Sequence, residues 1–453
     1  MVKNLTFLDR FHIPPLSIII QNSRNISILA YIVIGAMVID TILNQNEDVR
    51  TYFQTLLWDT GLFILLAAIA IVGQYCLLEF LKYKSREIRT KARHISISHQ
   101  IVTVLQYLLI ANFIVVIIGM VMFDRYPTAG LVFNTTATYG LNIGLMGAFT
   151  KIFFSWYKSN RNSIVVLLYG LSFAIVVIIS VVFLTASLSR FGEKEVFISP
   201  DSDPVSKSAP GSLIYSLNKI YHYSDIVSFA LKWIATAFLL YHYSKRMGVT
   251  KYWILISLPL VYFLGTYLDD FKIFEPHTET EEFYWSLYVT YNSTAGGILF
   301  YIGFVAATKH FHNNWAIKDY LIISGLGFLL FFSAGQTTLA FSPYPPFGFA
   351  TMSFYGLSTY LILLGLYASA ISVSQDIELR KSIKKSTLRE SRFLDSMGTA
   401  HMEKELMKRM VSKVHEEQKE LLNESGGVKS SLSEEDILNI VKEADKEIKE
   451  KRA

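Results

Sequence analysis

The chain has little charge and almost no cysteine. Of its 453 residues, 17% are charged, whereas water-soluble domains average about 25%. Its single cysteine, Cys76, lies inside an apolar run, so neither an intrachain disulfide nor a cysteine metal site can form. The formal net charge of +5 is modest. We interpret it as a bias of the loops toward one side of a membrane, not as a nucleic-acid-binding surface.

The sequence also lacks the short motifs of the common enzyme classes. It contains no Walker A loop, no HExxH motif, no nucleophile elbow and no dinucleotide-binding fingerprint. The hydrophilic C-terminal segment is too short for a histidine-kinase catalytic domain, and the last apolar run has no lysine that could hold retinal. These absences favour a protein that is not an enzyme, and they leave no catalytic residue, metal site or cofactor to predict.

Long apolar segments dominate the rest of the chain, which is 52% hydrophobic. A helix needs roughly 20 apolar residues to span the hydrocarbon layer, where backbone polar groups cannot stay open. The segments are continuous instead of alternating, which excludes a β-barrel. We therefore predict an all-α, polytopic membrane bundle of about ten transmembrane helices at residues 26–43, 56–80, 101–123, 131–154, 164–188, 226–243, 253–268, 287–308, 321–341 and 348–372.

The distribution of Lys and Arg orients these helices. If the N-terminus is cytoplasmic, the inner side carries 17 Lys and Arg residues up to the last run, and the outer side carries 7. Short basic loops stay in the cytoplasm, so we predict a cell-membrane protein with both termini inside. Residues 1–25 then form a cytoplasmic or interfacial segment, residues 26–374 the bundle, and residues 375–453 a cytoplasmic tail.

The tail differs sharply in composition from the bundle. Residues 376–453 contain 17 Lys and Arg and 17 Asp and Glu residues. Leu406, Met410 and Val414 recur at helical spacing, and Ile437 and Val441 do the same further on. We predict a helical tail whose apolar stripes need a partner, which is another protein, a second copy of the chain or the loops of this chain. The lipid bilayer is the partner of the bundle.

The fourth and eighth runs resemble each other at an offset of 158 residues. Residues 133–153 and 291–311 share eight identities in 21 ungapped positions, including Asn134 with Asn292 and Lys151 with Lys309. Helices two to five and six to nine would then be parallel repeats, an arrangement found in transporters. Chance similarity between apolar helices is the alternative.

Candidate binding residues are polar side chains inside the apolar runs. Asn134 and Thr136 lie in the fourth run, and Asn292 and Thr294 lie in the eighth. We expect them to face the bundle interior, because lipid offers no hydrogen bonds. They could line a cavity for a small polar solute, or they could only join helices to one another.

Lys232 is the basic residue near the middle of a run, where a bare ammonium costs about 2.5–3.5 kcal/mol on insertion scales. Asp225 lies seven residues earlier on the same helical face, too far for direct pairing unless the lysine extends outward. Asp40 and Asp59 are alternative partners from other helices. The lysine and its partner form either an ion-coupled site or a structural pair, unless Lys232 extends its ammonium to the membrane surface.

An acidic segment, 269–282, begins with Asp269 and Asp270. Such a pair on an outer loop also occurs in membrane glycosyltransferases that use lipid-linked sugars, and an ordinary solvated loop is the simpler interpretation.

Four short segments stand out around the end of the tenth run: Pro-Phe-Gly at 346–348, Tyr-Gly-Leu-Ser at 355–358, Leu-Arg-Lys-Ser-Ile at 379–383 and Leu-Asp-Ser-Met-Gly-Thr-Ala at 394–400. In these segments the chain resembles a group of uncharacterised multi-pass membrane proteins of ammonia-oxidising archaea. The resemblance covers about a sixth of the chain. The resemblance implies an archaeal plasma membrane and no particular activity.

Three functional hypotheses follow. The first is a membrane-embedded sensor or scaffold coupled to the cytoplasmic tail. The second is a secondary transporter of a small polar solute, motivated by the repeat. The third is a lipid-linked glycosyl transferase, motivated only by the acidic pair.

Overall fold

The computed structural model describes residues 23–45, 56–86, 89, 93–159, 164–202, 212–240, 248–265, 278–308, 315–335, 337–342, 344–375, 402 and 412–413. Ten helices account for most of them: α2 (Ser23–Gln45), α4 (Leu56–Lys84), α6 (Arg93–Phe123), α7 (Thr128–Ser159), α8 (Ile164–Phe191), α9 (Leu213–Leu240), α11 (Val249–Gly265), α12 (Glu279–Thr308), α13 (Trp315–Ala334) and α14 (Phe349–Gln375). Each overlaps one of the ten predicted apolar runs, so the all-α prediction is confirmed. Most of segments 1–25 and 375–453, and the pair Asp269–Asp270, lie outside the described residues.

Six of these helices are long and apolar enough to cross a membrane by length and composition. The six segments are Ile28–Gln45, Trp58–Lys84, Ile95–Phe123, Ile164–Phe191, Ile317–Phe341 and Phe349–Ile371. Shorter apolar stretches occur at Val249–Leu260 and Thr294–Val305. Helices α7 and α9 are less apolar because they carry the amides, hydroxyls and charges on which the candidate site depends.

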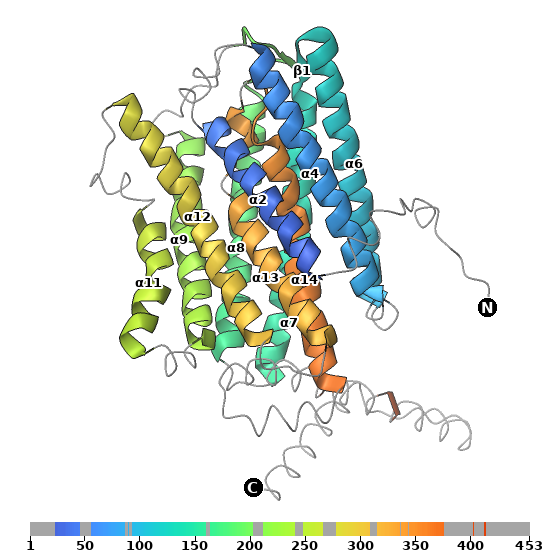
Figure 1. The fold of residues 1–453 in the computed structure, drawn as a ribbon, viewed down its shortest axis with the longest axis vertical. Helices are drawn as coiled ribbons and strands as arrows, with labels where there is room; N and C mark the ends of the chain where they lie inside the picture. Colours follow the sequence, from blue (N-terminus) through green and yellow to red (C-terminus); the bar gives the residue numbers. More distant parts are fainter. Residues whose placement is uncertain are drawn as a thin grey trace, which may run out of the picture.

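The helices lie side by side in one bundle with two distinct ends (Figure 1). At one end, β1 (Tyr126–Pro127) pairs antiparallel with β2 (Phe197–Ile198). This pairing joins the α6–α7 connection to the segment after α8. We call this the sheet end. At the opposite end, the Lys84 ammonium of α4 contacts the Asp319 carboxylate of α13 at 2.6 Å. The α13–α14 connection, which contains the 3₁₀ helix η3 (Leu339–Phe341), returns to the sheet end.

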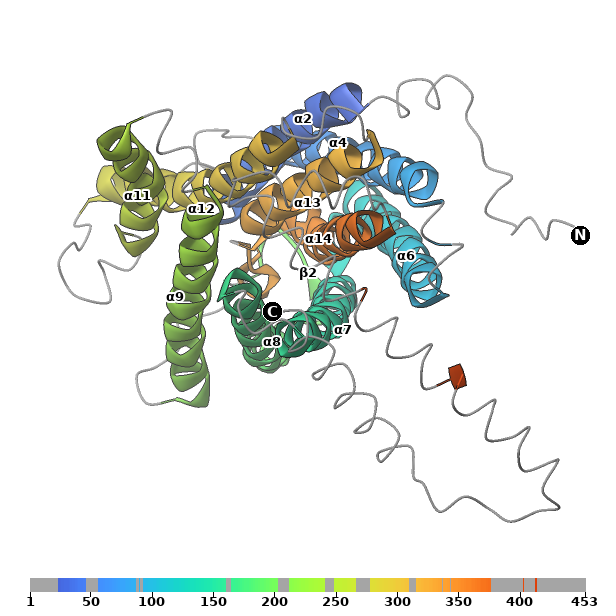
Figure 2. The same ribbon diagram turned by 90° about the horizontal axis from the view of Figure 1, so that it is seen from below.

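Helix α14 lies at the centre of the bundle. The segment Phe349–Ile371 is 100% buried, whereas only 28% of Ile95–Phe123 in α6 is buried. Helices α2, α4, α6, α7 and α13 all contact α14, and a view along the bundle shows it enclosed between them (Figure 2). The exposed face of α6 is apolar, with Ile101, Val104 and Val115 about half exposed. Hydrocarbon solvates such a surface, while water would make it an aggregation site.

Helices α13 and α14 approach each other at backbone distance. A Cβ atom added at Gly327 would lie 2.7 Å from the Ile362 backbone nitrogen, and one at Gly365 would lie 2.6 Å from the Tyr320 carbonyl oxygen. Each helix therefore supplies a glycine where the other passes. Small residues of this kind permit close packing of membrane helices, because van der Waals contact takes over where lipid removes the hydrophobic driving force.

Asp40 of α2 holds the first turn of α14. Its carboxylate is fully buried and accepts hydrogen bonds from the Gly348 N–H at 2.8 Å, the Thr351 N–H at 2.9 Å and the Thr351 hydroxyl at 2.7 Å. The two backbone N–H groups are donors that a helix leaves open at its N-terminus, and a carboxylate also complements the positive end of the helix dipole. Gly348 has φ +89, a conformation that favours glycine.

The next residues of α2 continue this contact. The Thr41 hydroxyl lies 2.9 Å from the Thr337 hydroxyl. The Asn44 amide donates to the Ser342 hydroxyl at 2.9 Å and to the Phe347 carbonyl at 2.6 Å. We call Asp40, Thr41 and Asn44 the α2 clamp. It fixes the α13–α14 connection at the sheet end.

Replacing Asp40 with alanine should destabilise the protein strongly. Each buried donor left without an acceptor costs about 1–3 kcal/mol. Asp40→Ala orphans two backbone N–H groups, while the Thr351 hydroxyl can still donate to the Met37 carbonyl, so we expect a loss of at least ~2 kcal/mol of unfolding free energy. Asp40→Asn should lose less, because its carbonyl oxygen still accepts. Denaturant unfolding in detergent measures both. The control is Thr136→Ala on the exposed side of α7, for which we expect a change within about 0.5 kcal/mol. Equal stability of the Asp40→Ala and Thr136→Ala variants would refute the clamp.

Lys194 reinforces the clamp from the segment after α8. Its ammonium donates to the Ser342 carbonyl at 2.8 Å. Burial lowers the pKa of Lys194 from 10.5 to about 8, because the surroundings disfavour the charged form. Below about pH 8 the lysine is protonated in both the folded and the unfolded chain, and the cost of burying the charge is fully present.

Stability should therefore rise between about pH 8 and 10.5, where the unfolded chain binds more protons than the folded one. Lys194→Met should flatten the stability curve in that window, as measured by unfolding at a series of pH values. Lys251→Met, at an exposed lysine of α11, is the matched control and should keep the wild-type slope. If the two variants give the same slope, the burial cost assigned to Lys194 is wrong.

Candidate functional site

Lys232 is a buried cation in the middle of α9. Its side chain is 2% exposed, and its ammonium donates to the Ser228 hydroxyl at 2.8 Å. The same nitrogen lies 5.5 Å from the ring centroids of Phe331 and Phe332 on α13. Aromatic ring faces at this distance attract a cation electrostatically. Lys232 therefore faces the bundle interior and does not extend to the membrane surface.

Asp225 and Lys232 lie on one polar stripe of α9. Tyr221, Asp225, Ser228 and Lys232 are spaced by four, three and four residues, which places them on one helical face. Tyr221 and Asp225 are partly exposed, whereas Ser228 and Lys232 are buried. Asp225 acts on Lys232 electrostatically. The Lys232 side chain extends one turn toward Asp225, where its ammonium donates to the Ser228 hydroxyl. The stripe thus leads from the sheet end of α9 into the interior.

Helix α8 supplies hydroxyls to the same stripe. The Ser172 hydroxyl donates to the Ser228 carbonyl at 2.9 Å and lies 3.2 Å from the Ser228 hydroxyl. One turn beyond Lys232, the Thr236 hydroxyl lies 3.0 Å from the Tyr169 hydroxyl. These contacts join α8 to α9 and place polar atoms beside the buried lysine.

Asn142 of α7 connects this region to α14. Its amide nitrogen donates to the Ser180 hydroxyl of α8 at 2.6 Å, and its amide oxygen accepts from the Thr359 hydroxyl of α14 at 2.5 Å. All three side chains are fully buried. A polar group in this setting costs free energy unless it is hydrogen-bonded, so Asn142 binds the three helices together.

Aromatic rings connect α7, near Asn142, with the Lys232 ammonium. The Tyr355 ring of α14 lies 5.0 Å from Tyr139 of α7 and 5.0 Å from Phe331 of α13. Phe331 is one of the two rings beside the Lys232 ammonium. The interior site therefore consists of Lys232 with Ser228, Ser172, Phe331 and Phe332. Tyr355 of α14 lies at its edge, against Phe331.

The residues predicted from the sequence separate into two groups. Lys232 belongs to the interior site, and Asp225 lies on the same stripe of α9 and acts on it electrostatically. Asn134 is buried but donates to the Phe349 carbonyl at 3.3 Å, and among the described contacts none joins it to Lys232. Thr294 is partly buried, and the Asn292 side chain lies outside the described residues.

Two expectations are wrong. Thr136 is exposed instead of facing the interior, because successive residues of a helix point about 100° apart and Asn134, Thr135 and Thr138 already occupy the inner face. Asp40, offered as a partner of Lys232, binds the start of α14.

The sequence-based reasoning missed Ser172, Ser180, Ser228 and Thr359. Ser228 lies one turn before Lys232 on the same face, and this spacing could have identified it. The other three hydroxyls have partners on distant segments, so no local pattern marks them.

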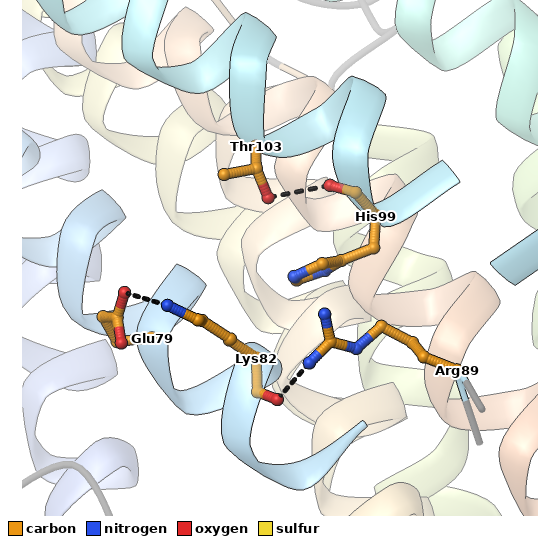
Figure 3. A network of polar contacts seen from close by, with 5 residues as sticks. All are labelled: Glu79, Lys82, Arg89, His99 and Thr103. Carbon is orange, nitrogen blue, oxygen red and sulfur yellow. Dashed lines mark hydrogen bonds and ion pairs between the residues drawn. The ribbon is translucent and has the colours of Figure 1, made fainter. Parts of the chain in front are cut away.

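A second group of polar side chains lies at the opposite end, on α4, on α6 and at Arg89 between them in the chain (Figure 3). The Arg89 guanidinium donates to the Lys82 carbonyl at 2.6 Å, and the Lys82 ammonium lies 3.6 Å from the Glu79 carboxylate. His99 is buried, and its Nδ1 lies 3.1 Å from the Tyr360 hydroxyl of α14. The His99 contact joins α6 to the far half of α14.

Comparison of the chain with protein-family models, with curated proteins and with solved structures found no match. Within the described part of the chain, no three or more His, Cys, Asp or Glu side chains lie close enough to hold a metal ion. The resemblance to the archaeal membrane proteins remains a prediction.

Proposed function

We propose that this chain is a membrane-embedded sensor in which α14 couples the interior site to the charged tail. The observation that carries the proposal is the position of α14. Its residue Tyr355 packs against Phe331 of the Lys232 site, its residue Thr359 binds Asn142 of α7, and the same helix ends at Gln375, where the charged segment 376–453 begins. A change at the site that displaces α14 would also displace Gln375, from which the tail continues.

The proposal includes the orientation in a cell membrane of the archaeal type. Ten spans, with the sheet end outside and both termini inside, satisfy the bias of 17 to 7 Lys and Arg residues. The six strongly apolar helices support membrane insertion. Helices α7, α9, α11 and α12 lie alongside them in the bundle and complete the ten (Figure 1).

Thiol labelling tests the orientation. In a Cys76→Ser background, Lys84→Cys and Ile437→Cys should both react with a membrane-impermeant reagent only when the cytoplasmic face is open. Trp58→Cys, an exposed position near the sheet end of α4, should react from the other side. Reaction of residues 84 and 437 from opposite sides would overturn the proposed topology.

Hydrogen exchange tests the coupling through α14. Asn142→Ala removes the bond to Thr359, so we expect residues 376–392 to exchange their amide hydrogens faster in the intact protein in nanodiscs. Coupling energies of about 0.5–2 kcal/mol correspond to changes of roughly 2–30-fold in rate. Thr136→Ala, at an exposed position of the same helix, should leave the tail unchanged. Tail exchange that is identical in wild type and Asn142→Ala would contradict the sensor.

A secondary transporter is the second candidate. A buried cation with a partly exposed carboxylate on one helical face is typical of intramembrane pathways. The proposed repeat agrees with the packing, because α7 lies along α8 as α12 lies along α13. A transporter requires net solute flux into sealed liposomes that is lost in Lys232→Met, whereas a sensor gives none. No observation among the described residues favours the glycosyl transferase.

A further inference from the structure

Three buried amide side chains from different helices meet one face of α14. Gln74 of α4 donates to the Ser353 hydroxyl, and Gln106 of α6 donates to the Ser353 carbonyl at 3.4 Å. Asn134 of α7 donates to the Phe349 carbonyl at 3.3 Å. Phe349 and Ser353 are four residues apart, so they lie one above the other on the same face of the helix. All three amides are fully buried, and their helices surround this side of α14 (Figure 2).

The hydrogen-bond partners fix which end of each amide faces α14. A backbone carbonyl only accepts hydrogen bonds, so Gln106 and Asn134 must present their nitrogen to it. The Ser353 hydroxyl donates its own hydrogen to the Ala350 carbonyl at 2.6 Å, and it therefore accepts from the nitrogen of Gln74. Exchanging oxygen and nitrogen in any of the three amides would set two acceptors against each other.

The oxygen of each amide is left open. The side-chain oxygens of Gln74, Gln106 and Asn134 are buried and have no hydrogen-bond partner. Each lies about 2.2 Å from its own nitrogen, because both atoms are bonded to one carbon, so all three stay near the same turn of α14. Buried polar atoms without a partner are costly and rare. A ligand that satisfies these three oxygens must donate hydrogen bonds or carry positive charge.

We propose that the three amide oxygens bind a monovalent alkali cation, such as Na⁺, between α4, α6, α7 and α14. Uncharged carbonyl oxygens coordinate alkali cations in channel selectivity filters, whereas protein sites for Ca²⁺ and Mg²⁺ use carboxylates. The three ligands here are all uncharged amides. This site is separate from Lys232, and the proposal does not depend on the sensing role of that lysine.

Asp40 supplies a negative charge near the site. Its fully buried carboxylate accepts from Gly348 and Thr351, and no basic side chain of the described residues contacts it. Thr351 and Ser353 are two residues apart, about 200° around the helix, so the carboxylate and the amides flank the same turns of α14 from opposite sides. A cation at the amides is attracted by this carboxylate, because a low dielectric constant strengthens the interaction.

Thermal unfolding of the full-length protein in nanodiscs of neutral lipid tests the proposal. At constant ionic strength, replacing N-methylglucamine chloride with sodium or potassium chloride should raise the melting temperature in a saturable manner, because a ligand of the folded state stabilises it. A wild-type protein that responds to neither cation overturns the proposal and leaves water as the partner of the amides. A saturable response to calcium chloride that exceeds the response to both alkali cations overturns the monovalent assignment.

Two variants from different helices locate the response. Gln106→Met removes one ligand oxygen and keeps the length of the side chain, and Asn134→Leu removes another. Each amide makes one long hydrogen bond to α14, so we expect both variants to fold. The cation concentration for half-maximal stabilisation should rise at least about tenfold in each, since even the loss of a partner of a metal ligand has an effect of this size.

Gln100→Met is the matched control, because Gln100 is an exposed glutamine of the same helix as Gln106. It should keep the half-maximal concentration of the wild type. A wild-type value in both Gln106→Met and Asn134→Leu would overturn the assignment of the cation to these amides. The titration of the wild type decides the proposal even where a variant fails to fold.

Discussion

The burial of α14 is the constraint on which the rest of the structure depends. A helix surrounded by other helices on all sides must have every polar side chain and every open backbone donor matched by a neighbour. Asp40 from α2, Asn142 from α7 and His99 from α6 each meet this requirement at a different level of the helix. The surrounding helices are thus positioned by what α14 needs, and their outer faces are left to the lipid.

Hydropathy predicted the ten helices well and their arrangement poorly. Length and apolarity reveal a spanning segment, because only a helix satisfies its own backbone in hydrocarbon. The innermost helix is harder to identify, since faces that meet lipid and faces that meet protein are both apolar. In α14, small residues such as Gly356, Ser358 and Gly365 indicate that the helix is buried. This indication becomes clear only once the packing against α13 is known.

The candidate site was half predictable for the same reason. Lys232 and Asp225 stand out because charge is costly in a membrane helix, and their spacing places them on one face. Ser172 and Asn142 take their roles from helices far away in the sequence, which no local pattern reports. Thr136 is an error of a different kind: its polar neighbours Asn134 and Thr135 face the interior, but Thr136 itself lies on the exposed face of α7.

The close contact of α13 and α14 at Gly327 and Gly365 has a mechanical consequence. Because the two helices are in backbone contact at a glycine of each, sliding one along the other would bring side chains into the space that the glycines leave for backbone. The two helices should therefore move together. Any displacement that begins beside Tyr355 therefore emerges at two points on the same side of the bundle, the exit of α14 at Gln375 and the entrance of α13 at Trp315. The tail and the segment that joins α12 to α13 would thus report a single event together.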